Sequence, residues 1–347
     1  MRYSTSDQSH YTFQVYVQDP SSGKIYDFSK AVETATWQTY RLSSQPGTLE
    51  LVLDGNVVRD RNIELPPGCR IRFGVNGEDF FYGLTEEVEL MKSTEKRYRL
   101  PAVDHLRFLQ SVESAYRAVG STASGFFEQL MTEHNARIRS VGSEGFNFAV
   151  REASTAPLDD YYFSGVTLYS MLKSTLALAH IAEPRQYMLR DNMGTIEFRE
   201  LKALRRPLII GDESFGESYT YGVMINNQTY NIIRVVRDNE EIGKREVWQR
   251  YHSINVRNWG PRQLTIEADD HLTDAEISAK IDLHLAAFNR VRRKLKLTCV
   301  GINGLQAGDG VQIRLDDARI DAAHWIENCT HVYSENSHMM DLELYLV

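Results

Sequence analysis

The sequence lacks any apolar run that approaches the roughly 18 residues needed by a membrane-spanning helix. Its first residues, MRYSTSDQSHYTF, also lack the apolar core of a secretory signal. We therefore expect no signal peptide and no membrane insertion. The chain is expected to stay in a cytoplasm or to leave it by a route other than secretion.

Cysteine is scarce, with three in 347 residues: Cys69, Cys299 and Cys329. They are far apart and odd in number, which is neither a disulfide framework nor a metal-ligand spacing. Each lies in a strand-like run. The pattern therefore predicts three buried, reduced thiols.

Basic residues are also fewer than acidic ones. The 47 acidic side chains exceed the 39 basic ones, and the formal net charge is −8. Dedicated nucleic-acid-binding proteins carry a basic footprint, so this balance argues against that class. The length predicts two to four domains, and 42% hydrophobic with 25% charged residues is typical of a soluble globular protein.

The common catalytic motifs are missing. The string nearest to a GxSxG elbow, 211–216 (GDESFG), has the wrong spacing. The glycine-rich string 304–310 (GLQAGDG) lacks the Lys-Ser/Thr of a P-loop, so it is predicted to shape a loop before a strand. Neither HExxH nor CxxC occurs. We predict no catalytic residue, no cofactor and no metal ligand.

A few residues keep reactive chemistry open as an alternative. They are two acidic pairs, one histidine and one acidic loop: Asp159-Asp160, Asp316-Asp317, His105 and Asp269-Asp270-His271. Sequence neighbours on a strand point to opposite faces, so the acidic pairs do not form shared sites by themselves. A structural histidine and a solvated acidic loop are the commoner interpretations of the other two.

Period-two hydrophobic patterns fill residues 11–103. Three leucines in 48–53 (TLELVL) alternate with other side chains, which places them on one face of a strand. Asn76-Gly77 separates two further strand-like runs and predicts a tight hairpin, because both turn positions need positive φ. Short strands with regular turns indicate a small barrel or sandwich.

Helical periodicity begins after residue 104. The segments 125–137 and 167–180 each place apolar side chains on one helical face, and Thr167 is the expected N-cap of the second. Two strands then flank a turn at 191–194 (DNMG). This mixture predicts an α/β unit over 106–205.

The last third returns to strands around one helix. Residues 230–238 and 244–250 predict a β-hairpin with a polar tip. Thr273 and Glu276 form a capping box that begins the helix. The cations of 290–294 are expected in its last turn, opposite the negative end of the helix dipole. A helix between strand pairs predicts an insertion.

Several short motifs are notable for their order. In the second half they are 229–233 (TYNII), 238–246 (DNEEIGKRE), 259–264 (WGPRQL), 286–296 (AAFNRVRRKLK), 307–311 (AGDGV), His331 and 338–344 (HMMDLEL). In the front half they are Trp37, 46–49 (PGTL), 81–83 (FYG), 98–104, and Thr167-Leu168 with Leu176. This order resembles the XkdQ-like family of prophage tail hub proteins. Pro261 is inserted relative to the family pattern, and Met339 stands where Thr is usual.

The resemblance implies a baseplate hub in the virion of a contractile phage or in a phage-tail-like bacteriocin (tailocin). Such a hub is a homotrimer of subunits with two tube-like β-barrel domains, so it joins the six-fold tail tube to the three-fold central spike. The implied partners are the tail tube protein, the spike, the tape-measure protein, a LysM-type tail protein and baseplate wedge proteins. DNA is implied only as passing cargo, and enzymatic activity is not implied.

The residues and the resemblance together predict an α+β fold, mainly β, in four parts. These are a first tube-like barrel (1–105), a mixed α/β domain (106–205), a second barrel split between 206–250 and 295–347, and an inserted helix-containing domain (251–294). A negatively charged lumen would repel DNA phosphates.

The hairpin tip is the candidate subunit interface, formed by Asp238, Asn239, Glu240, Lys244 and Arg245. Its charged turn and patterned arms suit a partner surface. An ordinary surface hairpin is an equally weighted alternative, because exposed polar hairpins are frequent.

Two other functions stay open. A cell-wall (peptidoglycan) hydrolase of the same particle would use a carboxylate pair such as Glu197 and Glu200 across a cleft. A carbohydrate-binding module would stack sugars on the aromatic runs 80–82 and 161–163, although strand aromatics more often pack in cores.

Overall fold

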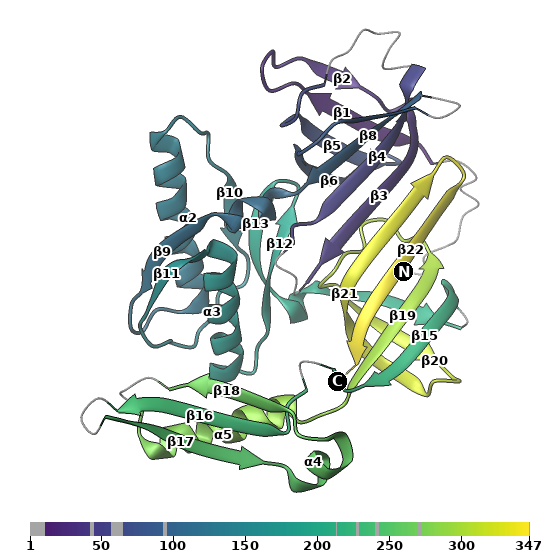
Figure 1. Cartoon of the computed structure of the whole chain (residues 1–347). Coiled ribbons are helices and arrows are strands. Elements are labelled where there is room, and N and C mark those ends of the chain that lie inside the picture. Colours follow the sequence, from purple (N-terminus) through teal and green to yellow (C-terminus); the bar gives the residue numbers. More distant parts are fainter. Residues whose placement is uncertain are drawn as a thin grey trace. The chain divides into compact units, whose positions relative to one another are not determined.

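The chain forms two compact units, shown in Figure 1. The computed structural model describes residues 11–41, 45–56, 65–92, 96–212, 214–226, 229–239, 243–268 and 272–346. The first unit comprises Met1–Tyr219 with Lys296–Leu344, and the second Thr220–Leu295 with Tyr345–Val347. The chain leaves the first unit through strand β15 (Gly216–Met224) and returns through strand β19 (Arg292–Val300), so the second unit is an insertion.

A 14-stranded sheet dominates the described part of the chain. Its early strands are β1 (Phe13–Gln18), β2 (Ile25–Asp27), β3 (Val32–Tyr40), β4 (Thr48–Asp54), β5 (Arg70–Val75), β6 (Glu78–Thr85), β7 (Glu89–Lys92) and β8 (Lys96–Val103). Its late strands are β14 (Arg205–Gly211), β15, β19, β20 (Gly310–Leu315), β21 (Ile320–Ser334) and β22 (Ser337–Leu346). The main path runs β15-β19-β22-β21-β3-β4-β8-β6-β5-β1-β2; β7 pairs with β8, and β20 pairs with β14 and β21.

The predicted alternation decides which face of β4 turns inward. Leu49, Leu51 and Leu53 are fully buried and pack in one cluster with apolar side chains of β1, β5 and β8. Burial of each leucine contributes about 1.5–3 kcal/mol, so a one-residue slip in register would be costly. The Asn76-Gly77 turn between β5 and β6 is confirmed, with φ values of 54° and 86°.

Strand β21 joins the early and late strands into one sheet. Its first part, Ile320–Trp325, pairs with β20, and its later part, Ile326–Ser334, pairs with β22. Residues Asn328–Ser334 also pair antiparallel with β3, so segments from opposite ends of the sequence lie side by side (Figure 1). We call the β3–β21 pairing the seam.

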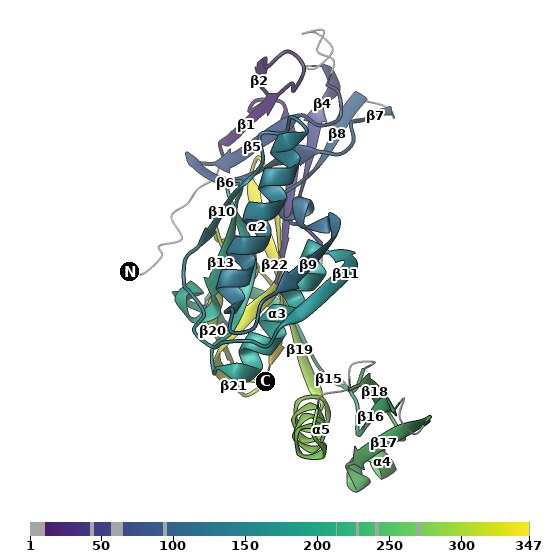
Figure 2. The ribbon, with the colours of Figure 1, turned by 90° about the vertical axis from the view of Figure 1, so that its left-hand side faces the viewer.

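The mixed α/β part lies between the two groups of strands in the sequence. Its elements are η1 (His105–Gln110), β9 (Val112–Arg117), α2 (Ala123–Ser140), β10 (Asn147–Val150), β11 (Tyr161–Thr167), α3 (Leu168–Ala182), β12 (Tyr187–Asn192), β13 (Thr195–Glu200) and η2 (Leu201–Leu204). Strands β10, β13 and β12 form a three-stranded sheet, and Figure 2 shows α2 beside β10 and β13. Apolar side chains of α2 and α3 share one buried cluster. The hydroxyl of Thr167 accepts a hydrogen bond from the Ser170 N–H, so the predicted N-cap is confirmed.

The second unit is a three-stranded sheet with a helix on one face. Its elements are β16 (Ile232–Asn239), β17 (Lys244–Tyr251), α4 (Ser253–Trp259), β18 (Gln263–Glu267) and α5 (Asp274–Phe288). Strand β16 pairs antiparallel with β17 and parallel with β18. Ile233 and Val235 pack against Ile277 and Ile281 of α5, whose axis is seen end-on in Figure 2.

This unit departs from the sequence expectation in two ways. The hairpin β16–β17 belongs to the inserted unit and not to the late strands of the 14-stranded sheet, because it forms a separate sheet with β18 and the apolar face of β16 is buried against α5. The cations of 290–294 do not lie in the last turn of α5, since the helix ends at Phe288 and β19 begins at Arg292. The capping box of Thr273 and Glu276 is confirmed.

All three cysteines are buried and free of disulfides, as predicted. Burial raises the pKa of each thiol, that of Cys299 to about 12. A thiol held neutral in this way is a poor nucleophile. Among the residues that the structure describes, no helix combines the length and the apolar character that a membrane crossing requires.

Candidate functional site

Most of the motifs singled out in the sequence contact one another through buried polar side chains. We call each buried side chain, together with its hydrogen-bond partners from distant segments, a joint. The first joint links Gly47, just before β4, with Asp104, just after β8. The Asp104 carboxylate accepts hydrogen bonds from the N–H groups of Gly47 and Leu106, both at 2.9 Å. A Cβ at Gly47 would overlap this carboxylate, so the position requires glycine. Burial, and then the charge of Asp191, raise the pKa of Asp104.

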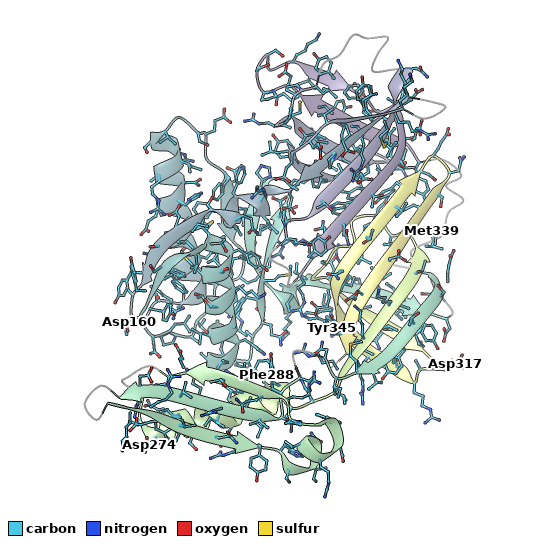
Figure 3. The ribbon with its side chains drawn as sticks, viewed as in Figure 1. Asp160, Asp274, Phe288, Asp317, Met339 and Tyr345 are labelled. Atoms are coloured by element: carbon cyan, nitrogen blue, oxygen red, sulfur yellow. The ribbon has the colours of Figure 1, made fainter. Side chains whose placement is uncertain are left out.

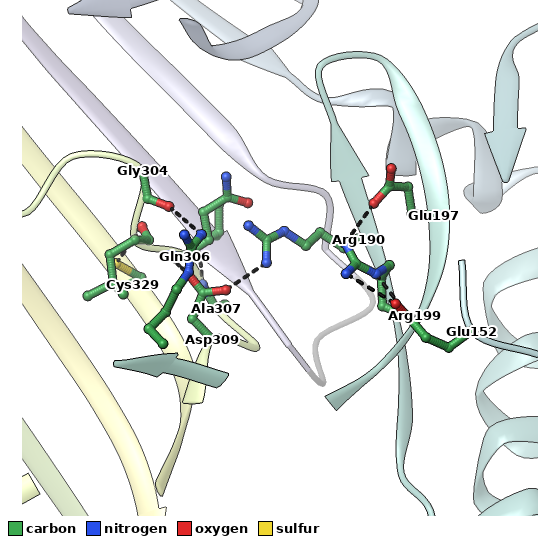
Figure 4. A network of polar contacts seen from close by, with 12 residues as sticks. Glu152, Arg190, Glu197, Arg199, Gly304, Gln306, Ala307, Asp309 and Cys329 are labelled. Atoms are coloured by element: carbon green, nitrogen blue, oxygen red, sulfur yellow. Dashed lines mark hydrogen bonds and ion pairs between the residues drawn. The ribbon is translucent and has the colours of Figure 1, made fainter. Parts of the chain in front are cut away.

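A second joint is built on Asp309, in the predicted loop before β20. Its carboxylate is fully buried and accepts hydrogen bonds from Nη1 of Arg190 at 2.8 Å and Nε of Arg206 at 3.1 Å (Figure 4). Arg190 belongs to β12 and Arg206 to β14. One carboxylate therefore ties the mixed part to the late strands. A buried charge is tolerated there because it is paired on both oxygens.

Glu197 on β13 is the centre of an adjoining network, also seen in Figure 4. It accepts hydrogen bonds from Asn192 at 3.1 Å, Arg151 at 2.7 Å and Arg199 at 3.1 Å. Burial acts to raise the pKa of Glu197, but these three hydrogen bonds together outweigh it and lower the pKa. Arg199 also donates to Glu152 at 3.0 Å.

His331 and His338 lie on the neighbouring strands β21 and β22. The His331 Nδ1 lies 2.8 Å from Nε2 of His338, and its Nε2 lies 2.7 Å from the carbonyl oxygen of Leu305. A carbonyl only accepts, so His331 donates through Nε2 and receives the Nε2–H of His338. Burial lowers the pKa of His331 to about 4 and, with the neighbouring His331, that of His338 to about 3. Both rings are neutral at pH 7, and His331 stacks on Trp37 across the seam.

In the second unit, several motifs meet around the fully buried Asn231. Its Nδ2 donates to the carbonyl oxygens of Gly260 at 2.8 Å and Asn255 at 3.1 Å. Its Oδ1 accepts from the N–H of Arg262 at 2.9 Å. Asn255 donates onward to the side-chain oxygen of Asn289, at the end of α5, at 2.8 Å.

The hairpin tip presents charges that are already paired with each other. Arg245 donates through Nε and Nη2 to the two carboxylate oxygens of Asp238, each at 2.6 Å. The hydrogen bond from Arg245 lowers the pKa of Asp238. Asn239 pairs in register with the exposed Lys244, and Glu240 lies outside the described residues. The side chains of Asp238, Lys244 and Arg245 are exposed.

The chain matches a protein-family model described as YQBQ-like over residues 35–345. The chain belongs to the YQBQ-like family. This YQBQ-like chain is 21% identical over 278 residues to the phage-like element PBSX protein XkdQ of Bacillus subtilis (strain 168), a match that covers 80% of this chain and 81% of that protein. The resemblance to the XkdQ-like family is confirmed.

Solved structures share the fold of this YQBQ-like chain. The 43 kDa tail protein of prophage MuSo2 from Shewanella oneidensis matches with a TM-score of 0.68 at 10% identity, over 96% of this chain and 98% of that chain. The E. coli c3393 protein matches with a TM-score of 0.50 at 11% identity, over 90% of this chain and 73% of that chain. It is described as a component of the type VI secretion system with structural similarity to the T4 tail proteins gp27 and gp5.

The other reactive candidates are dispersed over this YQBQ-like chain. Asp160 lies at the periphery of the β9–β11 pair and Asp317 at the turn between β20 and β21 (Figure 3). The His105 ring packs between Tyr82 and Phe108, with centroid distances of 5.4 Å to each. Residues 269–271 lie outside the described residues. Within the described ranges, no three His, Cys, Asp or Glu side chains gather as a metal site requires.

The carboxylates named for a hydrolase do not form a catalytic pair. Both oxygens of Glu197 accept hydrogen bonds from the same chain, and Glu200 accepts a hydrogen bond from Arg185 at 2.6 Å. Residues three apart on a strand point to opposite faces. A general acid in a glycosidase needs a raised pKa, and that of Glu197 is lowered.

At the Asp309 joint, sequence patterns in the YQBQ-like chain identified the carboxylate but not its two arginine partners. Asp309, Asn231 and His331 all lie in quoted motifs. Arg190 and Arg206 carry no local signal, because an arginine on a strand end is commonly solvated. The sequence shows an aspartate in a glycine-rich loop but not its burial, and it is the burial that calls for a cationic partner.

Proposed function

We propose that this protein is the structural hub of the baseplate in a contractile tail or tailocin. It would act as a homotrimer that joins the six-fold tail tube to the three-fold central spike. The observation that carries the proposal is membership of the YQBQ-like family over 35–345. The fold shared with a prophage tail protein, and with a protein described as similar to gp27 and gp5, supports it.

The arrangement of strands supports a ring built from two positions per subunit. We propose that β1–β8 form one tube-like barrel and that β14, β15 and β19–β22 form the other. Three subunits would then present six positions to a six-fold tube. The seam already joins both groups of strands within one subunit. The path ends, β2 and β15, would be covered by neighbours, since unpaired sheet edges invite pairing.

The chemistry of the joints supports a structural, non-enzymatic role. Asp309 and Glu197 are ionic groups whose oxygens are taken up by arginines of the same chain. Both polar atoms of the Asn231 side chain are hydrogen-bonded to backbone groups. Groups bonded in this way hold segments together, whereas a catalytic acid or base must keep an oxygen or nitrogen within reach of a substrate.

In the particle, the hub would contact the tail tube protein on one face and the spike on the other. The tape-measure protein, a LysM-type tail protein and baseplate wedge proteins are proposed as further partners. The hairpin tip around Asp238 and Arg245 is proposed as a subunit contact. With a net charge of −8, the lumen of a DNA-carrying tail would repel phosphates and let DNA pass.

Mass photometry of the full chain, alone and with its particle's spike protein, tests the hub proposal. A trimer in either sample is expected. A chain that stays monomeric with the spike present contradicts the proposal. Cryo-EM of the tail tip adds a test of the lumen, which should not be lined mainly by lysine and arginine.

A zymogram on peptidoglycan tests the rival hydrolase. No clearing is expected from the purified chain. Clearing by the wild type that disappears in Glu197→Gln would show an enzyme and remove the non-enzymatic assignment.

A further inference from the structure

A polar cavity of about 410 Å³ lies in the first unit beside the Asp309 joint. Four arginines and two carboxylates line it: Arg190, Arg199, Arg205, Arg206, Glu197 and Asp309. Four guanidinium groups against two carboxylates leave two positive charges in excess. The excess stands out in a chain whose net charge is −8.

The two lining carboxylates are already occupied. Asp309 is fully buried between Arg190 and Arg206. Glu197 is 1% exposed and bound by Arg151, Arg199 and Asn192. Neither carboxylate is therefore available to neutralise Arg205, which forms no ion pair with any residue in the described part of the chain.

Guanidinium donors remain available on the same wall. Arg199 donates hydrogen bonds through Nε and Nη2 to Glu152 and through Nη1 to Glu197. Within the described residues, Arg190 donates through Nη1 alone, and Arg206 donates through Nε and Nη2. Arg190, Arg205 and Arg206 thus keep N–H groups for a further acceptor.

We propose that this cavity binds an oxyanion, either a carboxylate or a phosphate, through Arg190, Arg205 and Arg206. A guanidinium fork matches both groups by donating two parallel, charge-assisted hydrogen bonds. Asp309 fixes Arg190 and Arg206 before any ligand arrives, so less side-chain freedom is lost on binding. Since Arg190 and Arg206 come from different segments of the chain, the anion would also reinforce the Asp309 joint.

The same chemistry has two sources. One is a free anion such as inorganic phosphate. The other is an acidic side chain of a neighbouring protein, whose carboxylate would enter the cavity during assembly. Both sources need the arginines, and they differ in whether the carboxylate is carried by a peptide.

Isothermal titration calorimetry of the full chain in a low-salt, phosphate-free buffer tests the proposal. The probes are inorganic phosphate and an oligoglutamate peptide capped at both ends. Saturable binding of at least one probe is expected. In Arg205→Gln, binding should weaken about tenfold or more, because one charge-assisted contact is lost. Arg205 is exposed, so this variant should keep the wild-type melting curve.

Arg319→Gln is the matched control, since Arg319 is an exposed arginine of the same unit in the turn between β20 and β21. Its affinity for the probes should equal that of the wild type. Binding of phosphate alone supports the site and assigns a free anion. Tighter binding of the peptide supports the site and assigns a partner's carboxylate. Absence of saturable heat with both probes overturns the proposal, as does equal binding by Arg205→Gln.

Discussion

Asn231 is a single side chain that holds three backbone groups of the second unit. Asn231→Ala leaves the carbonyls of Gly260 and Asn255 and the N–H of Arg262 without this partner. We expect the unfolding free energy to fall by roughly 2–4 kcal/mol, because buried unpaired groups are costly. Urea denaturation followed by tryptophan fluorescence measures the change. Gln249→Ala, at an exposed position of β17, is the control and should change little.

The buried histidines make stability depend on pH at the residue scale. The folded-state pKa values of about 4 for His331 and about 3 for His338 lie below the ordinary 6.5. As pH falls, the unfolded chain therefore binds protons first. The stability that depends on neutral rings is complete above pH 6.5 and is lost as pH falls through the folded values.

His338→Gln tests this dependence. Between pH 6.5 and 5, the variant should lose less stability per pH unit than the wild type, by up to about 1.4 kcal/mol. Unfolding titrations at several pH values give the two slopes. His180→Gln, at an exposed ring, should keep the wild-type slope. Equal slopes in the wild type and His338→Gln would show that His338 is not responsible.

At the scale of elements, the capping box sets where α5 begins. Thr273→Ala removes the hydroxyl that accepts the Glu276 N–H, and we expect a loss of about 1 kcal/mol. Thr273→Ser retains the hydroxyl and should keep most of the stability. Thermal denaturation of the three proteins compares them. A serine variant as unstable as the alanine variant would mean that the hydroxyl is not what matters.

Local signals predicted the beginnings and turns of elements. Asn76-Gly77, Thr167 and Thr273 each act within a few residues, so the sequence carries their whole cause. The end of α5 was predicted wrongly because cations suit a helix end and an exposed strand face equally. Strand pairing determines that these cations lie on a strand and not at the helix end, since the neighbouring Leu295 and Leu297 on β19 alternate into the core.

At the scale of the whole molecule, the insertion predicts that the first unit folds without the second. Strands β15 and β19 are neighbours in the sheet, so a short Gly-Ser link from Met224 to Arg292 can replace residues 225–291 and leave both strands whole. The shortened chain should unfold in one cooperative transition, because the clusters around Leu49 and Phe126 stay complete. Circular dichroism during heating records it. Deletion of 320–334 breaks the seam and should prevent folding.

The joints mark the limit of what the sequence predicts. The motifs identify Asp309 and Asn231 as special, yet the partners Arg190 and Arg206 lie 119 and 103 residues away from Asp309. Pairing at such separations depends on register across the whole sheet, which local patterns do not encode. For the same reason, local sequence patterns do not predict the seam or the packing of the hairpin against α5.

Strand β21 also has a mechanical consequence. A pull along this strand would load its hydrogen bonds to β3 together in shear, whereas a pull across it would break them one after another. Residues Asn328–Ser334 share that load. Force that reaches one group of strands is therefore delivered to the other along a common axis. The early and late strands are therefore expected to move together under load and not independently.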